Sequence, residues 1–125
     1  VDGFSDDVLA PGFGSEICAS ERTGDEAFTA AEPKDGQWIE TVATSCPSAP
    51  IQPLTHKVDD LEDAIDNLNA GGMTAGHLGI AWARYLIAPE WSSVWPSASD
   101  PLPDSSPANI KAVILMTDGA FNTEY

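Results

Sequence analysis

The apolar run from Ala112 to Met116, inside the stretch KAVILMTDGAFN, constrains the fold of this chain more than any other feature. It is rich in β-branched residues and too short for an ordinary helix, which is typical of a strand buried on both faces. Such strands occur in parallel sheets whose faces are covered by helices. The sequence therefore predicts an α/β fold with a parallel central sheet.

Thr117, Asp118 and Gly119 directly follow this predicted strand. In open α/β sheets, ligands bind just beyond the carboxyl ends of the strands. Asp118 is therefore the first candidate site residue. The alternative is that Asp118 and Gly119 only form a turn after a core strand.

Length and charge narrow the range of functions. A chain of 125 residues, 42% of them hydrophobic, is long enough for one modest core, and so for one domain or part of one. Its net charge of -15 repels a phosphate backbone, so no nucleic-acid partner is predicted. The chain has no apolar run of membrane-span length, no signal segment and no initial Met. These features are consistent with a piece excised from a longer protein, which leaves its location open.

Cys18 and Cys46 lie 28 positions apart, without the close pairing of zinc or thiol redox sites. We predict a disulfide between them, and the alternative is two unrelated buried thiols. The disulfide would staple a loop insertion at about 16–53, a stretch dense in turn-forming residues. Because disulfides persist outside the reducing cytosol, the pair favours a periplasmic or extracellular location.

Two helices are predicted between this insertion and the strand. The first carries an apolar stripe at helical spacing, with Thr55 as a candidate N-cap and with the stripe formed by Val58, Leu61, Ile65 and Leu68. Acidic residues cover its other face and are interpreted as solvated, with a calcium site as the weaker alternative: Asp59, Asp60, Glu62, Asp63 and Asp66. The second helix is expected from about Ala75 to Ile87 and ends before Pro89.

Thr74 stands at the start of the second predicted helix, after two glycines. Its default role is an N-cap, and the functional alternative is an oxygen ligand to a metal ion. Trp91 and Trp95 lie in the loop that follows the helix, where they either plug the surface of the domain or form a contact patch.

The order of these elements resembles the central part of a von Willebrand factor type A domain, a Rossmann-like, three-layer fold. In that family a divalent cation, usually magnesium, is held by a D-x-S-x-S segment, a Thr from a separate loop and an Asp that ends a later strand. Thr74 in GGMT matches that Thr, and Asp118 in LMTDG matches that Asp. The resemblance implies that both residues bind Mg²⁺, which prefers hard oxygen ligands.

A closer resemblance is to the type A domain of TadG-like (TadE/TadG-like) proteins of bacterial Tad/Flp pilus systems. The motifs that carry it cover most of the chain: ERTG from Glu21, AFT from Ala27, CP from Cys46, PLT from Pro53, GGMTAGHLGIAWARYLIAP from Gly71 and LMTDGAFNTEY from Leu115. It implies a non-enzymatic, metal-dependent module that binds a protein partner in pilus assembly or adhesion. The parent protein would be anchored in the inner membrane, with this region on the periplasmic side.

The chain departs from the family at the D-x-S-x-S segment. Asp2-Gly3-Phe4-Ser5-Asp6 has the first acid but neither serine at the needed spacing. The family places that segment upstream, so we expect a partial type A domain over residues 1–125, truncated at both ends. Two ligands hold magnesium poorly, and metal affinity is expected to be weak or absent.

Two other function classes compete with this expectation. A hydrolase would need a nucleophile and a base, but no G-x-S-x-G elbow is present, and His56 and His77 are the only histidines. His77 follows Thr74 closely but is interpreted as structural, so no enzyme is predicted. The other class is an acidic, secreted cation-binding module without a protein partner, which would bind cations weakly and without a preferred site.

Overall fold

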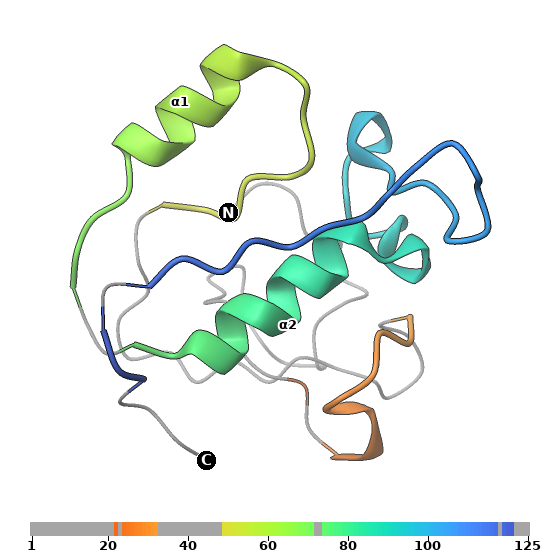
Figure 1. Cartoon of the computed structure of the whole chain (residues 1–125), viewed down its shortest axis with the longest axis horizontal. Coiled ribbons are helices and arrows are strands. Elements are labelled where there is room, and N and C mark those ends of the chain that lie inside the picture. Colours follow the sequence, from red (N-terminus) through yellow and green to blue (C-terminus); the bar gives the residue numbers. More distant parts are fainter. Residues whose placement is uncertain (1–21, 23, 33–48, 72–73, 118, 122–125) are drawn as a thin grey trace, which may run out of the picture.

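The computed structural model describes residues 22, 24–32, 49–71, 74–117 and 119–121. Its regular elements, in chain order, are the 3-10 helix η2 (Gly24–Glu26), the α-helices α1 (Val58–Asp66) and α2 (Gly76–Ile87), and the 3-10 helices η3 (Pro89–Trp91) and η4 (Ser97–Ser99). Helix α2 runs through the middle of the molecule, α1 lies at one edge, and η3 and η4 follow from the carboxyl end of α2 (Figure 1).

The predicted α/β fold, a Rossmann-like type A domain with a parallel central sheet, is wrong for the part of the chain that the structure describes. That part contains helices and irregular segments but no β-sheet. Residues 111–117, where the central strand was expected, form a nearly straight non-helical trace (Figure 1). Ile114 is 86% exposed and Met116 is 88% exposed, whereas a central strand is buried on both faces. The apolar run has the composition of a strand, but a strand forms only when other strands pair with it.

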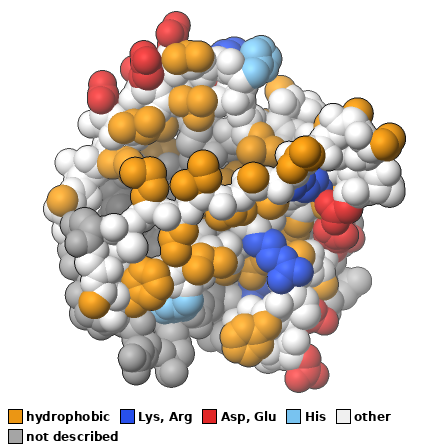
Figure 2. All heavy atoms as spheres, in the orientation of Figure 1, with side chains coloured by type: hydrophobic (Ala, Val, Ile, Leu, Met, Phe, Trp, Pro, Cys, Tyr) orange, Lys and Arg blue, Asp and Glu red, His pale blue; other side chains and the backbone are white. Residues whose placement is uncertain are grey.

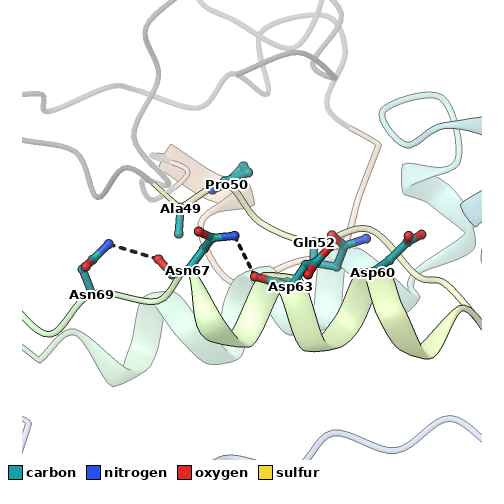
Figure 3. A pocket seen from close by; sticks show the side chains of 8 residues that line it. Ala49, Pro50, Gln52, Asp60, Asp63, Asn67 and Asn69 are labelled. Atoms are coloured by element: carbon teal, nitrogen blue, oxygen red, sulfur yellow. Dashed lines mark hydrogen bonds between the residues drawn. The ribbon is translucent and has the colours of Figure 1, made fainter.

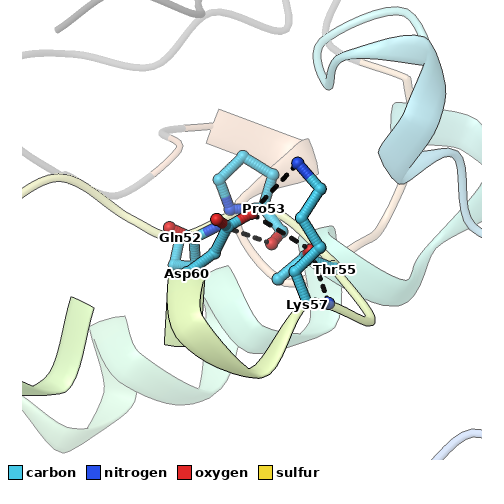
Figure 4. Close-up of polar contacts among 5 residues, drawn as sticks. All are labelled: Gln52, Pro53, Thr55, Lys57 and Asp60. Atoms are coloured by element: carbon cyan, nitrogen blue, oxygen red, sulfur yellow. Dashed lines mark hydrogen bonds and ion pairs between the residues drawn. The ribbon is translucent and has the colours of Figure 1, made fainter. Parts of the chain in front are cut away.

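Helix α1 confirms the predicted first helix, although its N-terminus differs in detail. Lys57 occupies the N-cap position and makes no side-chain capping bond, so the predicted Thr55 cap is wrong. The Thr55 hydroxyl instead accepts a hydrogen bond from the Lys57 backbone N–H at 3.1 Å and donates to the Asp60 carboxylate at 3.5 Å. Lys57 also forms an ion pair with Asp60 at 3.7 Å (Figure 4). These contacts tie the incoming chain to the first turn of α1.

Helix α2 confirms the second predicted helix within one residue of its expected start. Ala75 is the N-cap residue and makes no side-chain capping bond, so the predicted N-cap role of Thr74 is wrong. The helix ends before Pro89, as expected, because the residue that precedes a proline avoids the helical conformation. Ala88 accordingly has extended dihedrals, with φ -84° and ψ 123°.

An aromatic core forms where α2 meets η3 and the residues that follow it. Its buried members are Trp82, Tyr85, Ala88, Trp91, Val94 and Trp95. Trp82 makes edge-to-face contacts with Tyr85, Trp91 and Trp95, at centroid distances of 5.6, 6.0 and 6.4 Å. Trp91 is fully buried and Trp95 is 7% exposed. Of the two roles considered for Trp91 and Trp95, burial therefore favours the plug over an exposed contact patch.

Polar contacts hold Arg22 and residues 24–32 against this core, although they lie far from α2 in the sequence. The Trp91 indole N–H donates a hydrogen bond to the Ala30 carbonyl at 3.2 Å. The buried Arg22 guanidinium lies 5.6 Å from the Trp91 ring centroid and donates to the Ala31 carbonyl at 2.7 Å. A cation over an indole face is attracted by the ring quadrupole, so Arg22 contributes charge as well as packing. Part of the predicted loop insertion is thus integrated into the core.

Candidate functional site

Of the predicted metal-binding and disulfide-forming residues, Thr74 alone belongs to the part of the chain that the structure describes. Thr74 is half-buried, two positions before the first residue of α2. Asp118, Cys18 and Cys46 lie outside the described residues. The structure therefore neither brings Thr74 and Asp118 together nor separates them, and the predicted disulfide stays a prediction.

A close contact does join the amino-terminal end of α2 to the chain that follows the expected strand. Gly76 is buried, and a Cβ atom at this position would lie 2.2 Å from the ring of Phe121. This distance is far below van der Waals contact, so the ring occupies the space that a side chain at position 76 would need. The segments that carry Thr74 and residues 119–121 consequently meet at this end of α2.

The described residues offer little to a metal ion. Within them, no group of three or more His, Cys, Asp or Glu side chains lies close enough to hold a metal. Of the predicted pair, only the Thr74 hydroxyl belongs to the described part. The Thr117 hydroxyl, which precedes Asp118 in the chain, makes hydrogen bonds within its own turn, donating to the Gly119 carbonyl at 3.1 Å and accepting from the Gly119 N–H at 3.4 Å. Magnesium needs several hard oxygen ligands, and these groups alone do not supply them.

An open polar hollow of about 530 Å³ lies between residues 49–52 and α1 (Figure 3). Its lining residues are Ala49, Pro50, Gln52, Asp60, Asp63, Ala64, Asn67 and Asn69. The Asn67 side-chain amide donates to the Asp63 carbonyl at 2.8 Å, and the Asn69 amide donates to the Asn67 carbonyl at 3.0 Å. Two of the acids expected to be solvated, Asp60 and Asp63, therefore border a hollow whose lining carries negative charge.

Large apolar side chains are exposed to solvent at two places in the described part of the chain. The first place is the apolar stripe of α1 and the residues just after it, all at least 41% exposed: Val58, Leu61 and Ile65 on α1, and Leu68 beyond its end. The second is the segment 110–116, which we call the apolar segment and whose exposed large side chains are Ile110, Val113, Ile114, Leu115 and Met116. Figure 2 shows hydrophobic side chains gathered over α1 and in a row across the middle of this face. Contiguous apolar exposure of this kind marks interaction sites.

Sequence reasoning identified the stripe and residues 112–116 of the apolar segment, but not Ile110, and it assigned residues 112–116 to the interior. The signal was the unbroken apolar run, which has the same composition whether the segment is covered by the same chain or by a partner. Whether other strands of the same chain pair with the run decides between coverage by the chain itself and coverage by a partner, and the composition of the run does not contain that information.

No protein-family model, no curated protein and no solved structure matches this chain. The functional consequences of the resemblance to TadG-like type A domains are therefore proposals, supported by the quoted motifs. In the described part of the chain, no helix combines the length and the apolar character needed to cross a membrane.

Proposed function

We propose that this chain is a non-enzymatic protein-binding or assembly module, and that the apolar segment 110–116 is its principal contact surface. One observation carries the proposal. The segment holds Ile110, Ile114 and Met116 at 96%, 86% and 88% exposure in a non-helical backbone. Burying such side chains contributes roughly 25 cal/mol for each Å² removed from water, so a partner that covers them gains substantial free energy.

The shape and composition of the segment favour a particular mode of binding. A non-helical backbone with β-branched side chains can add to the edge of a partner's sheet, where main-chain hydrogen bonds give affinity and alternate side chains give specificity. Among the described residues, no strand already pairs with this segment.

A protein partner suits the charge of the chain better than other surfaces. The net charge of -15 repels nucleic acid and the anionic face of a membrane. The resemblance to TadG-like proteins supports a partner in pilus or envelope assembly, on the periplasmic side of the inner membrane or outside the cell. Magnesium dependence is supported by the motif matches of Thr74 and Asp118 alone.

Site-specific photo-crosslinking in the native host tests this proposal. A photoreactive phenylalanine analogue at Ile114 is compared with the same analogue at Leu102, an exposed apolar residue outside the segment. We expect a discrete adduct with one protein from position 114 and none from position 102. The adduct should disappear when Met116→Asp is added. Equal adducts from both positions, or none from position 114, would contradict the proposal.

A further inference from the structure

Solvent exposure alternates along the apolar segment. Val113 and Leu115 are 46% and 47% exposed, whereas Ile114 and Met116 are 86% and 88% exposed. Successive side chains of an extended backbone point to opposite sides, so a period of two separates a side that faces the molecule from a side that faces solvent. The segment therefore lies along the rest of the chain and displays Ile114 and Met116 outward.

The amino-terminal end of the segment is held by an ion pair. The Lys111 ammonium donates to the Asp104 carboxylate at 2.5 Å. The Lys111 side chain is 20% exposed and that of Asp104 is 73% exposed, so the aliphatic stem of Lys111 is packed while its head reaches a solvated carboxylate. Because salt screens a pair of this kind, this end of the segment is held weakly.

The carboxyl-terminal end is held by an aromatic ring. The Phe121 ring occupies the space beside Gly76, the first residue of α2. More than half of the Phe121 side chain is covered, since it is 45% exposed. The two hydrogen bonds between Thr117 and Gly119 close the turn that leads from the segment to the ring. Burial of an aromatic ring contributes more than an exposed ion pair, so Phe121 is the stronger of the two anchors.

We infer that the apolar segment is a strap fixed at both ends, and that Lys111 and Phe121 are positioning residues that keep it extended. Figure 1 shows the strap crossing the molecule as a nearly straight trace. The inference rests on the proposed protein-binding function and deepens it. A partner that docks on an ordered segment loses less conformational entropy than one that must order the segment first, so the two anchors raise affinity without contacting the partner.

Backbone order parameters from ¹⁵N relaxation of the full chain test the inference without a partner. We expect values above about 0.8 for residues 112–116 in the wild type, and values below about 0.6 in Phe121→Ala. The amides of Trp82 and Tyr85 in α2 should keep their values, which shows that the variant retains its fold. Leu102→Ala, at an exposed apolar residue outside the segment, is the control and should change neither set.

A charge reversal tests the weaker anchor. Lys111→Glu places a second carboxylate opposite Asp104 and should lower the order parameters of residues 112 and 113, by less than Phe121→Ala does. Adding Asp104→Lys to the same chain restores an ion pair with reversed polarity and should recover the wild-type values. A residue that acts only by packing its stem would not be rescued in this way.

Three results would overturn the inference: order parameters of residues 112–116 below about 0.6 in the wild type, no change in Phe121→Ala, or no rescue by the reversed pair. The crosslink from position 114 separates the two proposals. Its yield should fall by about tenfold in Phe121→Ala, because the partner must then order the segment. If the crosslink forms while Phe121→Ala leaves the order parameters unchanged, the proposed function stands and the strap fails. If the order parameters fall as expected while no crosslink forms from position 114 in the wild type, the anchors stand and the proposed function fails.

Discussion

The ring of Tyr85 on α2 lies parallel to the ring of Trp91 on η3, with the centroids 3.9 Å apart and the planes 7° apart. The stack spans the break that Pro89 makes after the helix, so it fixes the direction in which the chain leaves α2. The Trp95 indole N–H reinforces this turn by donating to the Tyr85 carbonyl at 3.0 Å. The fold of the described part therefore depends on a few aromatic residues that are close together in the sequence.

Replacing Trp91 with Ala should destabilise the chain by about 3–5 kcal/mol, because the substitution removes a fully buried aromatic side chain and leaves a cavity. It also leaves the Ala30 carbonyl without its indole donor. Urea unfolding measures the change. Leu102→Ala, at a residue that is 56% exposed, serves as the control and should stay within about 0.5 kcal/mol of the wild type. Equal effects of the two substitutions would show that the aromatic core does not hold the fold.

The two glycines of α2 should respond differently to alanine. Gly79 is exposed, and a Cβ atom there meets nothing within 4 Å, so Gly79→Ala should stabilise the chain by roughly 0.5–1 kcal/mol through helix propensity. Gly76→Ala should give no such gain because the new Cβ atom collides with the Phe121 ring. Thermal unfolding measures both changes.

A double-mutant cycle tests whether the Phe121 ring causes the different responses of Gly76 and Gly79 to alanine. In a Phe121→Ala background, Gly76→Ala should no longer be penalised, and the two changes should be clearly non-additive. Additive effects would mean that Phe121 does not occupy the space beside Gly76.

Oxidation state tests the predicted link between Cys18 and Cys46. Alkylation without reduction should leave the mass unchanged, and alkylation after reduction should add two alkyl groups. Loss of the link by Cys46→Ser should lower the free energy of unfolding by about 3 kcal/mol in the chain-entropy account. Equal masses with and without prior reduction would end the disulfide prediction.

Calorimetric titration with magnesium tests the predicted ligands Thr74 and Asp118. We expect at most weak binding, which Asp118→Ala reduces by at least about tenfold, because the substitution removes the only carboxylate of the predicted pair. Asp66→Ala, at an exposed acid of α1, is the matched control and should leave binding unchanged. If both substitutions weaken binding equally, cations bind the acidic surface generally, as the alternative of an acidic cation-binding module predicts.

The helices were predictable from sequence because their signals are local. The spacing from Val58 to Leu68 predicts α1, and Pro89 ends α2 through restrictions on neighbouring residues alone. Their caps were not predictable in the same way. Thr55 and Thr74 are good N-cap residues by type, yet the N-cap positions are held by Lys57 and Ala75, neither of which makes a side-chain capping bond.

The sheet was mispredicted because pairing between strands is not local. Residues 112–116 have the apolar, β-branched composition of a buried strand, but that composition does not specify which other strands cover it. The burial of Trp91 in a Pro- and Ser-rich loop was equally hidden, because it depends on contacts with Tyr85 and Ala30. Of the candidate site, sequence analysis therefore identified the apolar residues but not their exposure.

Hydrogen–deuterium exchange of the apolar segment tests the central claim most directly. If residues 110–116 are unpaired and open to a partner, their backbone amides should exchange at rates close to those of an exposed loop, while the amides in the last turns of α2 stay protected. Adding a bound partner should then slow exchange in the segment. Strong protection of residues 112–116 in the isolated chain would contradict the account, because it would mean that the segment is already paired in a sheet.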